Sequence, residues 1–138
     1  MGIELILTSG IVATLVEQAE KAGCTEACGL LLGRRDTGGA TQISAVVPAA
    51  NVAADPARHF EIDPAALIAA HRAERGGGLA LVGYYHSHPT GSVSPSPTDA
   101  AMASGDGRVW AIIGGGQVCF WQDAPNGFIA LSTRADDG

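Results

Sequence analysis

The apolar run at residues 79–88, LALVGYYHSH, constrains the fold more than any other part of the sequence. Its length and composition predict a buried strand. The segment before it opens with an Asp-Pro pair and stops at three glycines, residues 76–78, which predicts a capped helix with Leu67 and Ile68 facing inward. The segment after it, residues 96–104, opens with SPTD and predicts a short helix. A buried strand between two helices indicates an α/β protein.

The remaining segments also combine helix and strand patterns. We expect Ser9 to cap a helix that ends at Gly23, because apolar residues recur between them with a helical period. The last three strand-like runs are joined by tight turns, so this end of the chain is expected to be largely antiparallel. Turn-forming residues bound six expected strands besides the buried one, at residues 3–7, 27–34, 40–47, 109–113, 117–122 and 127–133.

Length and charge limit the domain organisation and the partners. The chain has 138 residues, of which 46% are hydrophobic, and this is enough for one domain with an ordinary core. We expect that domain to cover residues 1–134 and residues 135–138 to be a disordered tail. Fourteen acidic residues against eight basic ones give a net charge of −6, which opposes binding to phosphate backbones. We therefore expect no nucleic-acid partner.

Cysteine usage and the first residues indicate the compartment. Cys24, Cys28 and Cys119 form no CxxC pair, so neither a disulfide framework nor a zinc ribbon is indicated. We expect reduced thiols, with Cys28 as a small buried residue that has no catalytic role. The start of the chain lacks the features of a signal peptide, and no apolar run approaches the roughly 18 residues of a membrane span. These features predict a soluble, cytoplasmic protein without membrane contact, and they leave its oligomeric state open.

Two histidines close the buried strand, as His86-Ser87-His88. Residues two apart in a strand point to the same face, so both imidazoles can approach one ion while Ser87 points away. Asp99 follows His88 by eleven residues, in the first turn of the expected helix, where it could supply an oxygen ligand. Two nitrogens, one carboxylate and an open fourth position describe a catalytic zinc site.

The same residues also have structural explanations. SPTD at residues 96–99 matches a capping box with proline at the first helical position, which needs no metal. An HxH pair at the end of a strand is, taken alone, more often a packing or surface feature. The joint pattern favours the metal site, because strand, loop and acidic helix start then each have one geometric role. His59 and His71 do not join this spacing, so we expect them to be partly exposed.

The sequence of residues 86–99 resembles the motif of the JAMM (MPN-plus) zinc metallopeptidases, a family that includes the prokaryotic JAB proteins. The match is gapless over these fourteen positions and includes Ser96. The family motif also has an upstream glutamate, and TEACGLLLG at residues 25–33 resembles its segment, with Glu26 at the glutamate position. A third segment, HFEIDP at residues 59–64, resembles the one that leads into the family's second helix.

The resemblance implies a fold and a role for each matched residue. The implied fold is a curved mixed β-sheet flanked by helices, the cytidine-deaminase-like α/β fold of JAB/MPN domains, holding one Zn²⁺ per chain. His86, His88 and Asp99 are the implied metal ligands. Glu26 is the implied general acid and base, and Ser96 is the residue implied to stabilise the oxyanion. Without the resemblance, Glu26 would be interpreted as a solvated acid at the start of a strand.

The implied activity is that of a zinc-dependent peptidase or isopeptidase. Between Asp99 and the final expected strands the chain has only a helix and tight turns, without the insertions by which eukaryotic deubiquitinases of the family grip ubiquitin. The compact form resembles members that act on ubiquitin-like sulfur-carrier proteins. We expect cleavage after the C-terminal Gly-Gly of such a carrier, to mature it or to release a sulfur-bearing product such as cysteine. Two alternatives stay open: a non-catalytic MPN scaffold, and a zinc amidohydrolase of a small amide.

Overall fold

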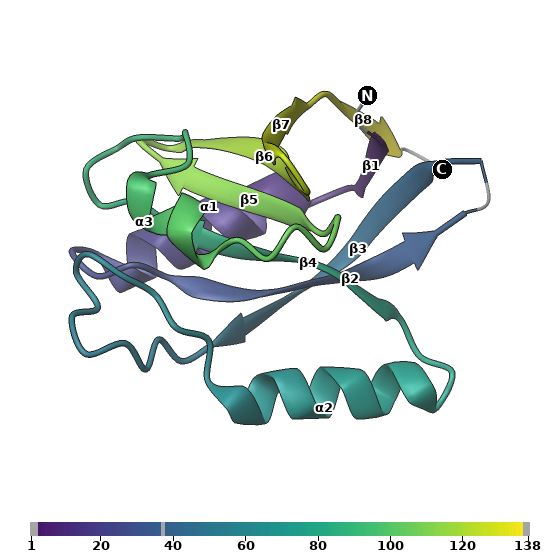
Figure 1. Cartoon of the computed structure of the whole chain (residues 1–138), viewed down its shortest axis with the longest axis horizontal. Coiled ribbons are helices and arrows are strands. Elements are labelled where there is room, and N and C mark those ends of the chain that lie inside the picture. The colour runs from purple at the N-terminus through teal and green to yellow at the C-terminus, as the bar shows by residue number, and fades with distance from the viewer. Residues whose placement is uncertain (1–2, 37, 137–138) are drawn as a thin grey trace.

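The computed structural model describes residues 3–36 and 38–136, and within them eight strands form one sheet in the order β7-β6-β5-β4-β2-β3-β1-β8 (Figure 1). The strands are β1 (Glu4–Thr8), β2 (Cys28–Arg35), β3 (Ala40–Ala49), β4 (Ala80–Ser87), β5 (Val109–Gly114), β6 (Gln117–Ala124), β7 (Gly127–Leu131) and β8 (Thr133–Asp136). The helices in the same residues are α1 (Ile11–Ala22), α2 (Pro64–Arg75) and α3 (Pro97–Met102). None of these helices is long and apolar enough to cross a membrane.

The sheet curls so that its two edges approach each other. β7 and β8 stand at opposite ends of the strand order, yet only Ser132 separates them in the sequence. Two steps along the chain span about 7 Å, so the edges can meet only in a strongly bent sheet, and Figure 1 shows β7 beside β8 and β1. β1 runs parallel to β3 and β8, and β4 parallel to β5, whereas the other pairs are antiparallel. The expected curved mixed sheet is confirmed.

Apolar side chains cover both faces of the sheet. α1 packs on one face, in a cluster that includes Leu31 and Tyr85. α2 packs on the other face, in a cluster that includes Leu30 and Trp110. β4 lies in the middle, with β2 on one side and β5 on the other, and six of its eight residues are buried. The buried strand expected from the apolar run is confirmed, and its last residues open onto the face that carries α2 and α3.

Three details of the helices differ from the sequence predictions. Ser9 does not cap α1, because the N-cap is Gly10, which has the left-handed φ of 86° that glycine adopts without strain. Ile68 does not face inward but is 53% exposed, whereas Leu67 packs against the sheet. Successive helix residues differ by about 100° around the axis, so only one of the two can point directly to the sheet. α3 ends at Met102, two residues before the expected end.

The C-terminal segment forms a strand where a disordered tail was expected. In β8, Ala135 pairs with Leu7 of β1, and the two strands run parallel. β1 has β3 on one side only, so its other edge carries backbone N–H and C=O groups that β8 satisfies. The strand expected at residues 127–133 is therefore divided at Ser132 between β7 and β8. Residues 137 and 138 of the expected tail lie outside the described residues.

Candidate metal centre

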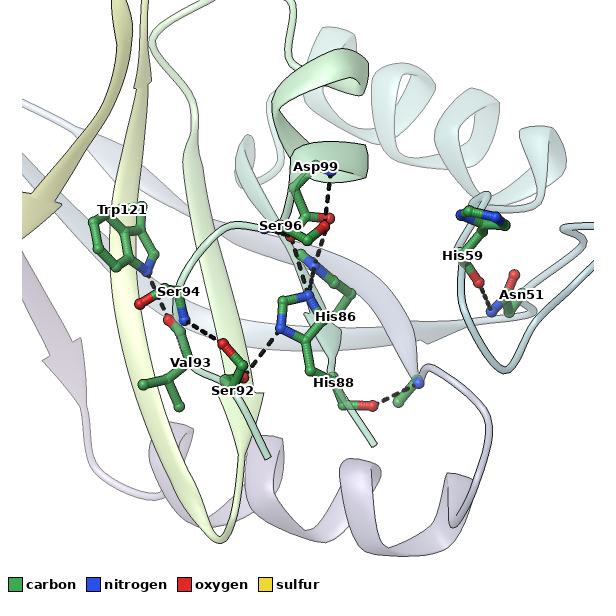
Figure 2. A network of polar contacts seen from close by, with 12 residues as sticks. Asn51, His59, His86, His88, Ser92, Val93, Ser94, Ser96, Asp99 and Trp121 are labelled. Atoms are coloured by element: carbon green, nitrogen blue, oxygen red, sulfur yellow. Dashed lines mark hydrogen bonds and ion pairs between the residues drawn. The ribbon is translucent and has the colours of Figure 1, made fainter. Parts of the chain in front are cut away.

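Three buried side chains converge at the end of β4 (Figure 2). His86 and His88 lie on the same face, with their Nε2 atoms 3.1 Å apart. Asp99, in the first turn of α3, places Oδ1 3.0 Å from Nε2 of His86 and Oδ2 3.0 Å from Nε2 of His88. The exposed fractions are 0%, 8% and 2% for His86, His88 and Asp99. The spacing in the sequence therefore brings together the three residues that it predicted would meet.

This donor set fits a metal ion. Two imidazole nitrogens and one carboxylate are ligands that zinc accepts, and tetrahedral ligands at zinc distances stand about 3.4 Å from one another. The distances of 3.0–3.1 Å between the donor atoms are close to that value. In the described part of the chain, no other group of three histidine, cysteine or acidic side chains comes together in this way.

A capping box holds Asp99 in place. The Ser96 hydroxyl accepts a hydrogen bond from the backbone N–H of Asp99 at 3.0 Å, and Oδ2 of Asp99 accepts one from the Ser96 N–H at 2.9 Å. The structural and the metal-binding explanations of SPTD are thus compatible, because the cap aims the carboxylate at the histidines. Although burial raises the pKa of Asp99, hydrogen bonds from His86 and His88 bring it well below its usual range. The carboxyl group is therefore an anion at neutral pH.

The two histidines are oriented by different neighbours. Nδ1 of His88 lies 3.0 Å from the Ser92 carbonyl oxygen, and if it donates there, the lone pair of Nε2 faces the centre. The His86 ring stacks on Phe60, with centroids 4.2 Å apart, and meets the edge of Trp110 at 5.7 Å. Its Nδ1 has no hydrogen-bond partner among the described residues. Burial lowers the pKa of His86, whereas the hydrogen bond with Asp99 raises that of His88.

Glu26 reaches the same centre from the neighbouring strand. β2 runs antiparallel to β4 with Cys28 opposite His86, and the pairing continues in the bonds that Ala27 makes with the Ser87 backbone and hydroxyl. Continuing this register places Glu26 across from His88. Glu26 is 6% exposed, and this burial raises its pKa to about 7. His88 acts in the opposite direction and lowers the pKa, whereas the Asp99 charge adds a smaller increase. Its carboxyl group can therefore gain or lose a proton near neutral pH.

A cavity of about 430 Å³ adjoins this centre. Glu26, His88 and Ser96 line it, together with Arg58 and the loop that follows β4. Ser96, which the family motif implies at the oxyanion, thus lies in the same cavity as Glu26. A molecule bound in this cavity would therefore contact a proton carrier, Glu26, a hydroxyl, Ser96, and one of the three converging donor residues, His88.

Sequence reasoning missed Asn51, which joins Glu26 to the segment that carries Phe60. Its amide donates to the carbonyl oxygens of Glu26 at 2.9 Å and His59 at 3.0 Å, the second of which Figure 2 shows. Its side-chain oxygen accepts from the backbone N–H of Ala53 and Glu61. A single asparagine in a loop has no recognisable spacing, so no signal in the sequence could have identified it.

Other residues lie where the sequence predicted or take no part. Cys28 is buried, and burial raises the pKa of its thiol to about 11, which keeps it protonated and confirms the expectation of a small buried residue. His59 and His71 are exposed, as expected, and neither joins the metal centre. Cys24, Cys28 and Cys119 are free thiols.

Comparisons with known sequences give one family. The sequence profile of the prokaryotic homologs of the JAB domain matches residues 8–124. The chain is 40% identical over 87 residues to the desampylase of Haloferax volcanii, and the aligned region covers 63% of this chain and 60% of that protein. It is 36% identical over 106 residues to a probable TtuB-protein conjugate cleaving protease of Thermus thermophilus, and the aligned region covers 74% of this chain and 65% of that protein. The match spans less than two thirds of the length of either relative.

Solved structures share the fold over nearly the whole chain. A protein of Desulfitobacterium hafniense superposes with a TM-score of 0.84 at 27% identity, covering 97% of this chain and 94% of that one. A protein of Salinibacter ruber gives 0.69 at 28% identity, covering 95% and 91%. A JAB1/MPN domain protein of Archaeoglobus fulgidus gives 0.60 at 18% identity, covering 96% and 99%, which bears on the fold alone.

Proposed function

The chain belongs to the prokaryotic homologs of the JAB domain, and on that premise we propose that it is a metal-dependent peptidase or isopeptidase. Its substrate is a ubiquitin-like protein, and the bond it cleaves is the amide that follows the C-terminal tail of that protein. The observation that carries the proposal is a buried carboxyl group with a pKa of about 7, on Glu26, which lines one cavity together with His88, one of the three converging metal-donor residues.

His86, His88 and Asp99 hold the metal ion, which we take to be zinc because two imidazoles and a carboxylate are a common donor set for that ion. Bound zinc would supply Lewis acidity and make water more acidic. Binding a cation requires deprotonated donors. The capped Asp99 carboxylate is already an anion, and a His88 ring that donates from Nδ1 to the Ser92 carbonyl oxygen presents the lone pair of Nε2 to the centre.

Glu26 and Ser96 carry the proton transfer and the charge. Glu26, whose burial raises its pKa to about 7 in the metal-free protein, takes a proton from the attacking water and returns it to the leaving amine. The Ser96 hydroxyl faces the developing oxyanion as a hydrogen-bond donor, while its oxygen keeps accepting from the Asp99 N–H. Both groups line the cavity in which the scissile bond must lie.

The substrate class rests on the relatives. Their names, a desampylase and a TtuB-protein conjugate cleaving protease, support conjugates of ubiquitin-like proteins as substrates. We further propose that the ubiquitin-like protein is a sulfur carrier, cleaved after its terminal Gly-Gly. A folded carrier with a Gly-Gly-X tail should be cut after the second glycine, and the isolated tail peptide should be cut poorly. Equal rates on both would argue against recognition of the carrier.

The metal site is tested by elemental analysis of the untagged protein and of Asp99→Ala. We expect about one zinc per wild-type chain, lost in the variant. Absence of zinc from the wild type after reconstitution would refute the metal site and favour a scaffold.

The mechanism is tested with Glu26→Gln, which should keep its zinc and lose orders of magnitude in turnover on the carrier substrate. Full activity of this variant would remove Glu26 from the mechanism. Activity on small amides without activity on any carrier would favour an amidohydrolase instead.

A further inference from the structure

Strand β6 directs two side chains at the segments on either side of α3. The indole N–H of Trp121 donates to the Val93 carbonyl oxygen at 3.0 Å, a bond drawn in Figure 2. The Asp123 carboxylate accepts from the backbone N–H of Ser104 at 3.0 Å and of Gly105 at 3.1 Å. Residues two apart in a strand share a face, so both side chains project from β6 on the side that carries the metal centre.

These bonds fall just before and just after the helix that carries Asp99. α3 has six residues, too few to be stable without support from its surroundings. Its only buried residue is Asp99, so packing of apolar side chains does not set its position. The loop that precedes it is tied to Trp121, and the chain that leaves it is tied to Asp123, which is itself only 2% exposed.

The same hairpin also supports the carbonyl that orients His88. Val93 follows Ser92, whose oxygen lies 3.0 Å from Nδ1 of His88. At the β5–β6 turn, a Cβ atom on Gly114 would lie 2.5 Å from that same Ser92 oxygen, so the loop rests directly on the hairpin. The β5–β6 hairpin therefore contacts the supports of two of the three donor side chains, although it contributes none of the donors itself.

We infer that Trp121 and Asp123 are positioning residues for the metal centre: they clamp both ends of α3 to β6 and so hold Asp99, and the Ser92 carbonyl, at the geometry that binds the ion. This inference rests on the proposed metal site. Groups that orient metal ligands from outside the coordination sphere are worth about 10–100-fold in metal affinity. The indirect action of these two residues places each at the lower end of that range.

The experiment measures the affinity of the whole chain for Zn²⁺ by competition with a chromophoric chelator, and the visible spectrum of the Co²⁺-loaded protein. Trp121→Phe keeps an aromatic ring and removes only the N–H donor. Asp123→Asn keeps the shape and leaves one backbone N–H without its acceptor. Gln122→Ala is the matched control, because the Gln122 side chain lies between Trp121 and Asp123, projects from the opposite face of β6 and bonds the Gly107 carbonyl oxygen, beyond the anchored Ser104 and Gly105.

We expect the dissociation constant for Zn²⁺ to rise about tenfold in Trp121→Phe and in Asp123→Asn, with altered Co²⁺ bands, and to stay unchanged in Gln122→Ala. Melting of the metal-free proteins separates a loss of metal affinity from a general loss of stability. A purely structural role would lower the melting temperature and leave the dissociation constant unchanged.

Two results would overturn the inference in distinguishable ways. A wild type that binds Zn²⁺ with variants that differ from it by less than about twofold would refute the clamp alone. A wild type that binds no Zn²⁺ would refute the proposed metal site and the clamp with it. If Asp123→Asn does not fold, Trp121→Phe decides the question by itself.

Discussion

Glu26→Gln should stabilise the metal-free protein at neutral and alkaline pH while it abolishes the proposed chemistry. The carboxyl group of Glu26 is 6% exposed, and no hydrogen-bond donor to its oxygens accompanies that burial among the described contacts. Burial raises its pKa from 4.5 to about 7, so ionising it costs the folded state more than the unfolded chain. Glutamine keeps the shape of the side chain and cannot ionise.

The raised pKa of Glu26 determines the size and the pH range of the effect. A tenfold change in an ionisation constant is worth about 1.4 kcal/mol, so a rise in pKa from 4.5 to about 7 corresponds to about 3 kcal/mol. Between these two values the folded state binds more protons than the unfolded state, and the stability of the wild type falls as pH rises. The difference between Glu26→Gln and wild type should therefore be near zero below pH 4.5 and reach about 3 kcal/mol in favour of the variant above pH 7.

The assay is urea denaturation at a series of pH values in the presence of EDTA, since a bound cation beside Glu26 would itself favour the carboxylate. The exposed residue Glu61 provides the control, because Glu61→Gln removes the same charge without the burial. A Glu26→Gln stability difference that does not change with pH, or that favours the wild type above pH 7, would show that burial does not govern this carboxyl group.

Three further variants test other parts of the centre. Ser96→Ala removes the hydroxyl that accepts from the Asp99 N–H and should cost about 1 kcal/mol in urea denaturation of the metal-free protein; an unchanged midpoint would contradict the cap. Asn51→Leu leaves several backbone groups without partners and should lower the free energy of unfolding by about 2–4 kcal/mol in the same assay. The control is Val52→Ala, which truncates an exposed neighbour and should change the free energy of unfolding little. His88→Ala should melt at the same temperature with and without chelator, whereas zinc-loaded wild type should lose stability on chelation; a chelator effect that persists in the variant would place the ion elsewhere.

The parts of the site that the sequence predicted are those that depend on residues close together in the sequence. Period-two alternation puts His86 and His88 on one face of a strand, and a capping box four residues long aims the Asp99 carboxylate. Both patterns act over a few residues, so they hold in almost any surroundings. The apolar run that became β4 is equally local, because a strand so rich in large apolar side chains is stable only when it is buried.

Predictions failed where contacts between residues far apart in the sequence determine the local structure. Ser132 divides the last expected strand because β1, at the other end of the chain, offers a free edge to β8. Ile68 is exposed because the rotation of α2 follows from how Leu67 and Ala70 meet the sheet, which the apolar period alone leaves undetermined.

The sequence by itself determined the class of the fold, the donor triad and its place at the end of a buried strand, since each follows from residues within one or two elements. Only the tertiary structure placed Glu26 across from His88, through a strand pairing that joins residues about sixty positions apart. It alone also placed Asn51 and the two β6 side chains as supports. Register between distant strands is set by the burial of whole faces and by backbone pairing, which no short stretch of sequence contains.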